Sequence, residues 1–253
     1  MKIFLLFVLL LTSCMPAASL PTETLFPIPD QETTSMPSIR YLALGDSYTI
    51  GESVNETERW SNQLVALVQS SPQFTKSNGG IDGCTLEVTI IAKTGWTTDE
   101  LWQGIQSTEI NPPYDLVSLL IGVNNQYRGR DIEEYREQFI FLLNKSIKYT
   151  GDEANKVIVL SIPDWGVTPF AKHKGSDSEK VAEEIDAFNA VNREETEKAG
   201  AHYVDITPIS REAFNDISLI ASDGLHPSGK MYTMWAEKAL PIALDILQVH
   251  KGE

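Results

Sequence analysis

The sequence predicts an α/β fold in which a parallel central sheet carries helices on both faces. Short apolar runs, typical of buried strands, alternate with longer segments whose apolar residues recur at helical spacing. This βαβαβ order requires parallel strands joined by crossover helices, which cover both faces of the sheet. The chain has 253 residues, of which 42% are hydrophobic and 22% charged. That length and composition favour one large globular domain over two.

Five segments are predicted to be strands, because each is a dense run of apolar or β-branched residues. They span residues 39–44, 86–92, 116–121, 157–162 and 201–205. The run 116–121 is apolar throughout, as expected of a strand that is covered on both faces. Pro163 ends the strand before it, because proline has no N–H for the sheet ladder.

Five further segments are predicted to be helices from the spacing of their apolar residues. They span residues 59–70, 97–106, 131–148, 178–199 and 229–249. Thr97 or Thr98 is expected to cap the second of these helices, with Glu100 in its first turn. The last helix is expected to continue despite Pro241 within it.

The residues before position 39 are predicted to lie outside the folded domain 39–253. Residues 1–13 carry Lys2 and then an apolar run, which is typical of a secretory signal and too short to span a bilayer. The segment 11–14, Leu-Thr-Ser-Cys, resembles the lipobox of bacterial lipoproteins, which implies cleavage before Cys14 and lipid on that cysteine. The alternative is an ordinary signal peptide cut near residues 17–19. Residues 14–38 are rich in Pro, Thr and Ser and are predicted to be a tether.

Composition excludes some classes of partner. The formal net charge of -15 disfavours nucleic acid, which requires clustered Lys and Arg, and disfavours adsorption to anionic lipid. If Cys14 carries lipid, Cys84 has no internal disulfide partner and is expected to be a small buried hydrophobic residue. No Cys/His cluster, HExxH, EF-hand, GxGxxG or P-loop pattern occurs, so no metal and no cofactor is predicted.

Polar residues are predicted to gather at one edge of the sheet. Parallel strands end at the same edge, and ligands of open α/β sheets bind there. The segments that follow the first four strands or precede the last helix are Gly45-Asp46-Ser47, Lys93-Thr94-Gly95-Trp96, Gly122-Val123-Asn124-Asn125, Pro163-Asp164-Trp165-Gly166 and Ser222-Asp223-Gly224-Leu225-His226-Pro227.

These segments contain the groups that acyl transfer requires. A serine hydroxyl needs a base to accept its proton, and histidine is the side chain poised near pH 7. Among the four histidines, His173 lies in a charged segment, His202 in a short strand and His250 near the C-terminus. That leaves His226, with Asp223 three residues earlier, where a turn can bring the carboxylate to Nδ1.

The predicted domain resembles the GDSL or SGNH family of serine esterases and lipases over about residues 39–249. The resemblance is carried by Ser47 after Gly45-Asp46, by Gly95, by Asn124 and by His226 with Asp223, in the order of the family. It implies a three-layer α/β/α sandwich with a parallel, flavodoxin-like sheet of about five strands.

The resemblance also implies a role for each of these residues. Ser47 would be the nucleophile, and its backbone N–H would be the first oxyanion donor. Gly95 would supply the second donor through its backbone, and Asn124 the third through its side-chain amide. Asp223 would orient His226, the general base and then the general acid.

Two positions depart from the family pattern. Asn125 stands where the family usually has Asp, which puts the hydrogen bonds that support Asn124 in question, and Tyr48 stands where many members have Leu. Four aromatic residues are expected either to line a pocket or to anchor loops: Trp60, Trp96, Trp165 and Tyr127. Asp46 and Asp164 are expected to serve turns and caps.

The sequence therefore predicts an exported, lipid-anchored serine esterase of the bacterial cell envelope. Its expected partners are a small-molecule ester and, through Cys14, a membrane. The favoured substrate is a small acyl ester, such as an acetyl group on a carbohydrate, because no long apolar lid segment is evident. The alternative is a longer acyl chain, as in a lysophospholipase or thioesterase. A non-catalytic binding lipoprotein would have a broken triad, whereas this triad is complete.

Overall fold

The predicted α/β class is confirmed by the computed structural model of the chain, which describes residues 38–77 and 85–248. The predictions for Cys14, for Cys84 and for residues 14–37 lie outside these ranges. The described strands form one five-stranded sheet in the order β2-β1-β3-β4-β5, and every pair is parallel. The strands are β1 (Ser38–Gly45), β2 (Thr85–Ala92), β3 (Leu116–Leu120), β4 (Val157–Leu160) and β5 (His202–Val204).

The five predicted helices are present, with ends close to those expected. They are α2 (Trp60–Ser70), α4 (Thr98–Gln106), α6 (Ile132–Tyr149), α8 (Ser178–Lys198) and α10 (Gly229–Gln248). Thr97 caps α4, and the side chain of Glu100 accepts the backbone N–H of Thr97 at 2.9 Å, as the capping pattern predicts. Pro241 lies on an exposed side of α10, which continues past it.

Further helices of four to six residues fill the connections, and most of them were not predicted. They are α1 (Ser47–Ile50), α3 (Pro72–Ser77), α5 (Val123–Tyr127), α7 (Pro169–Lys174) and α9 (Thr207–Arg211). The 3₁₀ turns are η1 (Glu56–Glu58), η2 (Ala154–Lys156), η3 (Trp165–Val167), η4 (Glu212–Phe214) and η5 (Ile217–Leu219). Helices this short contain too few turns for a repeating apolar pattern.

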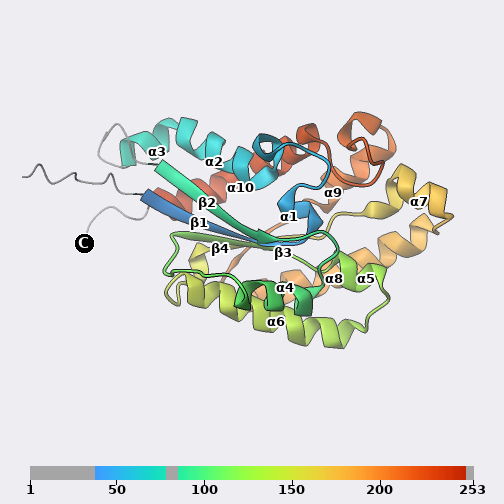
Figure 1. The fold of residues 1–253 in the computed structure, drawn as a ribbon, viewed down its shortest axis with the longest axis horizontal. Coiled ribbons are helices and arrows are strands. Elements are labelled where there is room, and N and C mark those ends of the chain that lie inside the picture. The colour runs from blue at the N-terminus through green and yellow to red at the C-terminus, as the bar shows by residue number, and fades with distance from the viewer. Residues whose placement is uncertain (1–37, 78–84, 249–253) are drawn as a thin grey trace, which may run out of the picture. The chain divides into compact units, whose positions relative to one another are not determined.

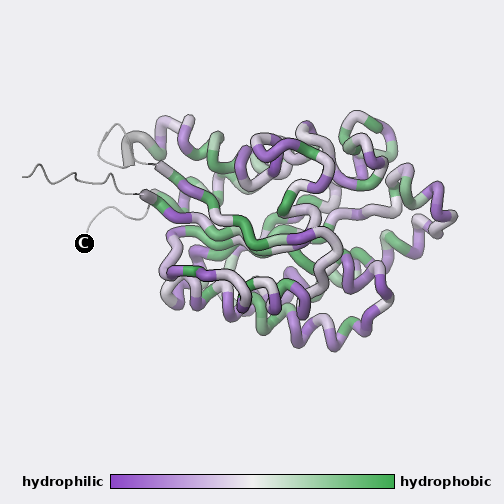
Figure 2. The backbone as a smooth tube through the Cα atoms, viewed as in Figure 1, coloured by the Kyte–Doolittle hydropathy of each residue, from purple (hydrophilic) through white to green (hydrophobic). Residues whose placement is uncertain are grey.

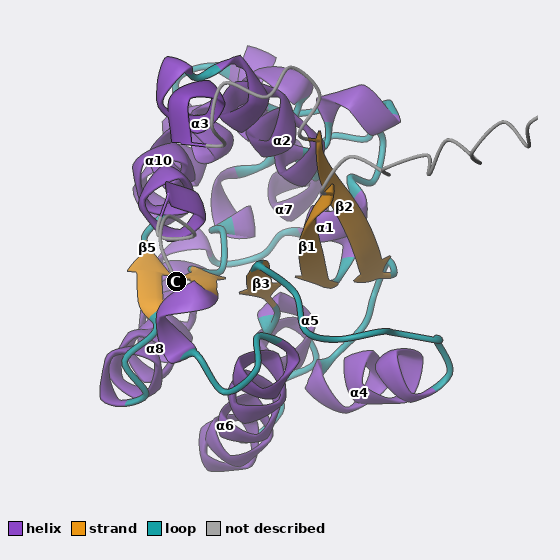
Figure 3. Ribbon diagram, turned by 90° about the vertical axis from the view of Figure 1, so that its left-hand side faces the viewer, coloured by secondary structure: helices purple, strands orange, loops and turns teal. Residues whose placement is uncertain are grey.

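The helices form two layers around the sheet. Helices α2, α3 and α10 cover one face, and α4, α6 and α8 cover the other (Figures 1 and 3). Hydrophobic residues gather along the strands between the layers, and hydrophilic residues mark the outer sides of the helices (Figure 2). None of the helices in the described ranges is long and apolar enough to span a bilayer.

Of the four aromatic residues expected either to line a pocket or to anchor loops, two are anchors. Trp60, the first residue of α2, is fully buried in the core. The ring of Trp96 packs on Gly104 of α4, where a Cβ atom would lie 2.1 Å from the ring. Only glycine leaves room for the indole there.

The strand order places a crevice where the catalytic residues are predicted to meet. The chain passes from β1 to β2 on one side, and then crosses back to β3 on the other side of β1. The connections that leave β1 and β3 therefore diverge, and ligands of doubly wound sheets bind at such a switch point. Helices α1, α5 and α7 lie together at this end of the sheet (Figure 1).

Candidate active site

The serine predicted as nucleophile begins the short helix that follows β1. Asp46 caps this helix, because its side chain accepts the backbone N–H of Tyr48 at 3.0 Å. As the first helical residue, Ser47 has a backbone N–H without a partner inside the helix. Gly45 is required before them, because a Cβ atom would lie 2.2 Å from Oγ1 of Thr49 and 2.5 Å from the carbonyl oxygen of Leu120.

The two other predicted oxyanion donors approach this helix from neighbouring loops. Gly95 has a φ of 86°, a backbone conformation that glycine adopts without strain. Asn124 lies in the first turn of α5, and its Nδ2 donates to the carbonyl oxygen of Trp96 at 2.9 Å. The same nitrogen makes a long contact of 3.5 Å with Oδ2 of Asp46, so this second N–H is only weakly engaged.

The predicted acid and base form a closed pair in the loop before α10. Nδ1 of His226 lies 2.6 Å from Oδ2 of Asp223, while Oδ1 of Asp223 accepts the backbone N–H groups of Leu225 and His226 at 2.9 and 3.0 Å. Burial acts to raise the pKa of Asp223, but the hydrogen bonds, that of His226 foremost, outweigh it and lower the pKa to about 2. Asp223 is therefore ionised at neutral pH, and because this carboxylate holds Nδ1 of His226, Nε2 is the ring nitrogen that could act as a base.

These residues meet at one cavity of about 150 Å³. It is lined by Ser47, Tyr48, Thr94, Gly95, Val123, Asn124, Tyr127, Trp165, Phe170, Leu225 and His226. Four of the five predicted site residues of the domain thus share the cavity, and Asp223 stands behind His226. Two other histidines lie elsewhere: Nε2 of His202 is 3.0 Å from the carbonyl oxygen of Asn155, and His173 is exposed in α7. His250 is outside the described residues.

Known proteins resemble this chain in sequence and in fold. Residues 43–234 match the GDSL-like Lipase/Acylhydrolase family. The chain belongs to this family. It is therefore a hydrolase that acts on ester bonds, and the family acts on small-molecule esters. None of the curated proteins matches it in sequence.

Solved structures share the GDSL fold with this chain. TesA has a TM-score of 0.59 at 17% identity, over 82% of this chain and 99% of its own. Axe2, an acetylxylan esterase from Geobacillus stearothermophilus, has a TM-score of 0.60 at 18% identity, over 82% and 95%. The lipase/acylhydrolase from Enterococcus faecalis has a TM-score of 0.57 at 18% identity, over 82% and 96%. At these identities the likeness is one of fold.

The side chain of Asn125, unusual for a GDSL protein, bonds to Thr98 through both its oxygen and its nitrogen. Its Oδ1 accepts the backbone N–H of Thr98 at 3.1 Å, and its Nδ2 donates to Oγ1 of Thr98 at 2.8 Å. The Thr98 hydroxyl in turn donates to the side chain of Gln138. An aspartate accepts only, whereas the amide both donates and accepts. Asn125 thus joins α5, the helix that also carries Asn124, to the start of α4.

Tyr48, the second departure from the GDSL pattern, forms part of the site. Its ring packs against the His226 ring, with centroids 5.4 Å apart, and against Trp235 at 6.2 Å. Burial raises the pKa of its hydroxyl well above the usual value, so the hydroxyl stays protonated. The residue therefore acts through packing, as the sequence analysis expects, but it packs directly on the predicted base.

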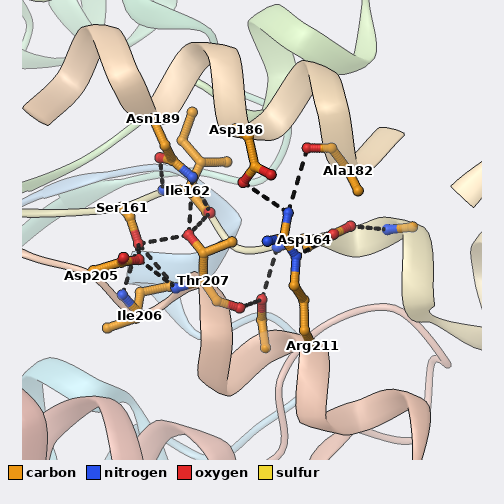
Figure 4. Close-up of polar contacts among 12 residues, drawn as sticks. Ser161, Ile162, Asp164, Ala182, Asp186, Asn189, Asp205, Ile206, Thr207 and Arg211 are labelled. Atoms are coloured by element: carbon orange, nitrogen blue, oxygen red, sulfur yellow. Dashed lines mark hydrogen bonds and ion pairs between the residues drawn. The ribbon is translucent and has the colours of Figure 1, made fainter. Parts of the chain in front are cut away.

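Asp46 and Asp164 serve as caps, as predicted. Oδ1 of Asp164 accepts the backbone N–H of Gly166 at 2.8 Å, and its Oδ2 accepts Nε of Arg211 at 2.9 Å. Arg211 also donates to Asp186 of α8 at 2.8 Å (Figure 4). This network holds the turn that carries Trp165, one wall of the cavity.

Two supporting residues escaped the sequence analysis. Oγ of Ser53 donates to Oδ2 of Asp223 at 2.8 Å, although Ser53 has a φ of 67°, which is unusual for a residue with a side chain. Nη2 of Arg128 donates to the carbonyl oxygen of Gly95 at 2.6 Å, and its Nη1 lies 3.2 Å from Oε1 of Glu100. The left-handed Ser53 has no sequence signature, and Arg128 follows α5 as an ordinary surface residue would.

Apart from Thr94, the remaining walls of the cavity are apolar. Phe170 comes from α7, and its backbone N–H donates to the carbonyl oxygen of Gly224 at 2.9 Å, which joins α7 to the loop of Asp223.

Within the described residues, no group of three or more His, Cys, Asp or Glu side chains could hold a metal ion.

Proposed function

We propose that the protein is a serine esterase that works through an acyl-enzyme on Ser47. The observation that supports this most directly is the shared cavity, which brings Ser47 and His226 together with Gly95 and Asn124. The bond of 2.6 Å between His226 and Asp223 adds the orienting carboxylate that a triad requires.

The proposed reaction has two symmetrical halves. Nε2 of His226 takes the proton of the Ser47 hydroxyl while Oγ bonds to the ester carbonyl carbon. The tetrahedral intermediate collapses, the bond to the alcohol oxygen breaks, and His226 gives its proton to the departing alcohol. Water then attacks the acyl-enzyme with His226 again as base, which releases the acid and regenerates Ser47. Asp223 stabilises the imidazolium in both halves.

Three N–H groups are proposed to hold the negative oxygen of the intermediate. They are the backbone N–H of Ser47, the backbone N–H of Gly95 and Nδ2 of Asn124. Asn124 has a hydrogen to offer, because its contact with Asp46 is long at 3.5 Å. The loss of one such donor typically slows an enzyme by about 100- to 1000-fold.

The proposed substrate is a small acyl ester, such as an acetyl group, on a carbohydrate. The cavity, at about 150 Å³, is smaller than the pockets of roughly 300–1000 Å³ that bind drug-sized ligands. Such a cavity suits an acetyl group better than the long chain of a lysophospholipid or fatty-acyl thioester.

Hydrolysis of p-nitrophenyl esters from acetyl to palmitoyl tests both parts of the proposal. We expect Ser47→Ala and His226→Asn to lower kcat/KM by at least about 1000-fold, with His202→Asn as the matched control. Activity of Ser47→Ala equal to that of the wild type would overturn the acyl-enzyme. A kcat/KM that rises toward palmitoyl would leave the esterase intact and replace the small acyl group by a long one.

We also propose that residues 1–13 are a lipoprotein signal peptide and that Cys14 carries lipid. Residues 14–38 would then tether the catalytic domain, residues 39–253, to a membrane of the cell envelope. Cys14→Ser should move the protein from the membrane fraction to the soluble fraction. A Cys14→Ser protein that still sediments with membranes would contradict the anchor.

A further inference from the structure

The rim of the cavity carries an aromatic side chain that the fold leaves in solvent. Tyr127 is 46% exposed, whereas Tyr48 and Trp165 in the same cavity are 4% and 6% exposed. Among the described residues, the Tyr127 hydroxyl has no hydrogen-bond partner. An exposed aromatic ring beside a ligand cavity is a feature of binding surfaces.

The Tyr127 ring is held in place despite its exposure. It packs edge to face on Trp165, with centroids 5.2 Å apart at 76°, and lies 6.4 Å from the Phe170 ring. Nε1 of Trp165 donates to the side chain of Gln126 at 2.8 Å, which fixes the indole. A ring already fixed in position loses little conformational freedom when a ligand covers it.

A polar side chain is bonded to Gly95, which lines the same cavity as Tyr127. The side chain of Arg128, the following residue, is 41% exposed, and it holds the Gly95 carbonyl and Glu100 with only part of its guanidinium. Since a guanidinium carries five N–H donors, some remain for a ligand. A pyranose ring has an apolar C–H face and a margin of hydroxyls, which this pairing of ring and donor matches. A long acyl chain would instead need a continuous apolar wall.

We propose that Tyr127 is the platform on which the sugar ring of the ester substrate stacks, with sugar hydroxyls toward Arg128 and the ester carbonyl at Ser47. The inference rests on the proposed function and names the alcohol side of the substrate as a pyranoside.

The test compares an acetylated xylooligosaccharide with ethyl acetate, whose alcohol is too small to reach the platform. The measured quantity is kcat/KM for the sugar ester divided by kcat/KM for ethyl acetate. We expect Tyr127→Ala to lower this ratio by about tenfold, mainly because KM for the sugar ester rises. Tyr127→Phe should keep the ratio, because the hydroxyl is not part of the platform. The matched control is Phe141→Ala on α6, since Phe141 is 41% exposed and does not line the cavity.

The outcomes separate this inference from the proposed function. An unchanged ratio in Tyr127→Ala, or an equal fall in Phe141→Ala, would overturn the platform. Wild-type protein that hydrolyses ethyl acetate but not the sugar ester would overturn it as well. If Ser47→Ala still hydrolyses both esters, the acyl-enzyme itself is wrong. Circular dichroism of each variant checks that it is folded.

Discussion

We expect Ser53→Gly to slow ester hydrolysis while lowering the stability of the fold by no more than about 1 kcal/mol. Ser53 holds a φ of 67° while its hydroxyl donates to Oδ2 of Asp223 at 2.8 Å. A residue with a Cβ atom pays roughly 1–2 kcal/mol for that backbone conformation. Strain of this kind persists where the surrounding structure holds it, often beside functional groups.

Three contributions determine how much Ser53→Gly changes the free energy of unfolding. Glycine relieves about 1 kcal/mol of strain, loses roughly 0.5–1 kcal/mol through its greater freedom in the unfolded chain, and gives up a hydrogen bond of about 1 kcal/mol. The sum leaves Ser53→Gly within about 1 kcal/mol of the wild type. Ser53→Ala keeps the strain and loses the hydrogen bond, so it should be about 1 kcal/mol less stable. Both variants leave Asp223 without this donor, and kcat/KM should fall by roughly three- to tenfold in each.

Steady-state hydrolysis and urea unfolding measure the two effects separately. Asp152, which also has a positive φ of 68°, provides the control, because Asp152→Gly relieves strain far from Asp223. It should keep full activity. The reasoning fails if Ser53→Ala and Ser53→Gly both match the wild-type kcat/KM. It also fails if glycine restores activity that alanine loses, because strain rather than the hydroxyl would then be the cause.

Burial raises the pKa of Asp46 to about 7, above the roughly 3.9 of an unfolded chain, so the folded protein keeps a proton there that the unfolded chain has lost. Stability should therefore fall as pH rises from 4 to 7, by up to about 1.4 kcal/mol per pH unit, and unfolding curves of Asp46→Asn should lack that slope. Asn125→Asp should keep kcat/KM within about threefold of the wild-type value. Asn125→Leu leaves buried polar groups unpaired and should lower the free energy of unfolding by about 2 kcal/mol, so a leucine variant as stable as the wild type would contradict this. Arg211→Ala removes the cation that pairs with the buried carboxylate of Asp164 and should lower the free energy of unfolding by about 3 kcal/mol. Arg193→Ala, which breaks the exposed pair with Asp205, should lower it by less than about 1 kcal/mol. Equal losses of the two variants in urea unfolding would contradict this prediction.

Elements long enough to repeat a pattern were predictable from the sequence. The apolar runs identified all five strands of the described sheet, and the long helices followed from their spacing and caps. The short helices were not predictable, because α1 or α5 is a single turn whose existence depends on the tertiary structure around it. Ser47 and Asn124 therefore lie on helices where the sequence indicated only loops.

The candidate site was predictable where its residues directly follow a strand or share a turn. Ser47 and Gly95 follow the ends of strands, and Asp223 reaches His226 across three residues. The supporting contacts were not predictable, because they join distant segments. Nothing local marks Phe170 as a wall of the cavity. Likewise, the aromatic residues 60, 96, 127 and 165 look alike in sequence, and only packing separates buried anchors from rim residues.

The hydrogen bond between Ser53 and Asp223 joins residues 170 positions apart. Helix α10, which follows His226, packs on α2 near the start of the domain. During synthesis Ser47, the proposed nucleophile, thus leaves the ribosome long before Asp223 and His226, which would activate it. Contacts so distant in sequence form late, because the closure of long loops costs entropy first. The proposed nucleophile therefore lacks its partners in an unfinished chain, and regained esterase activity in refolding would mark completion of the whole domain.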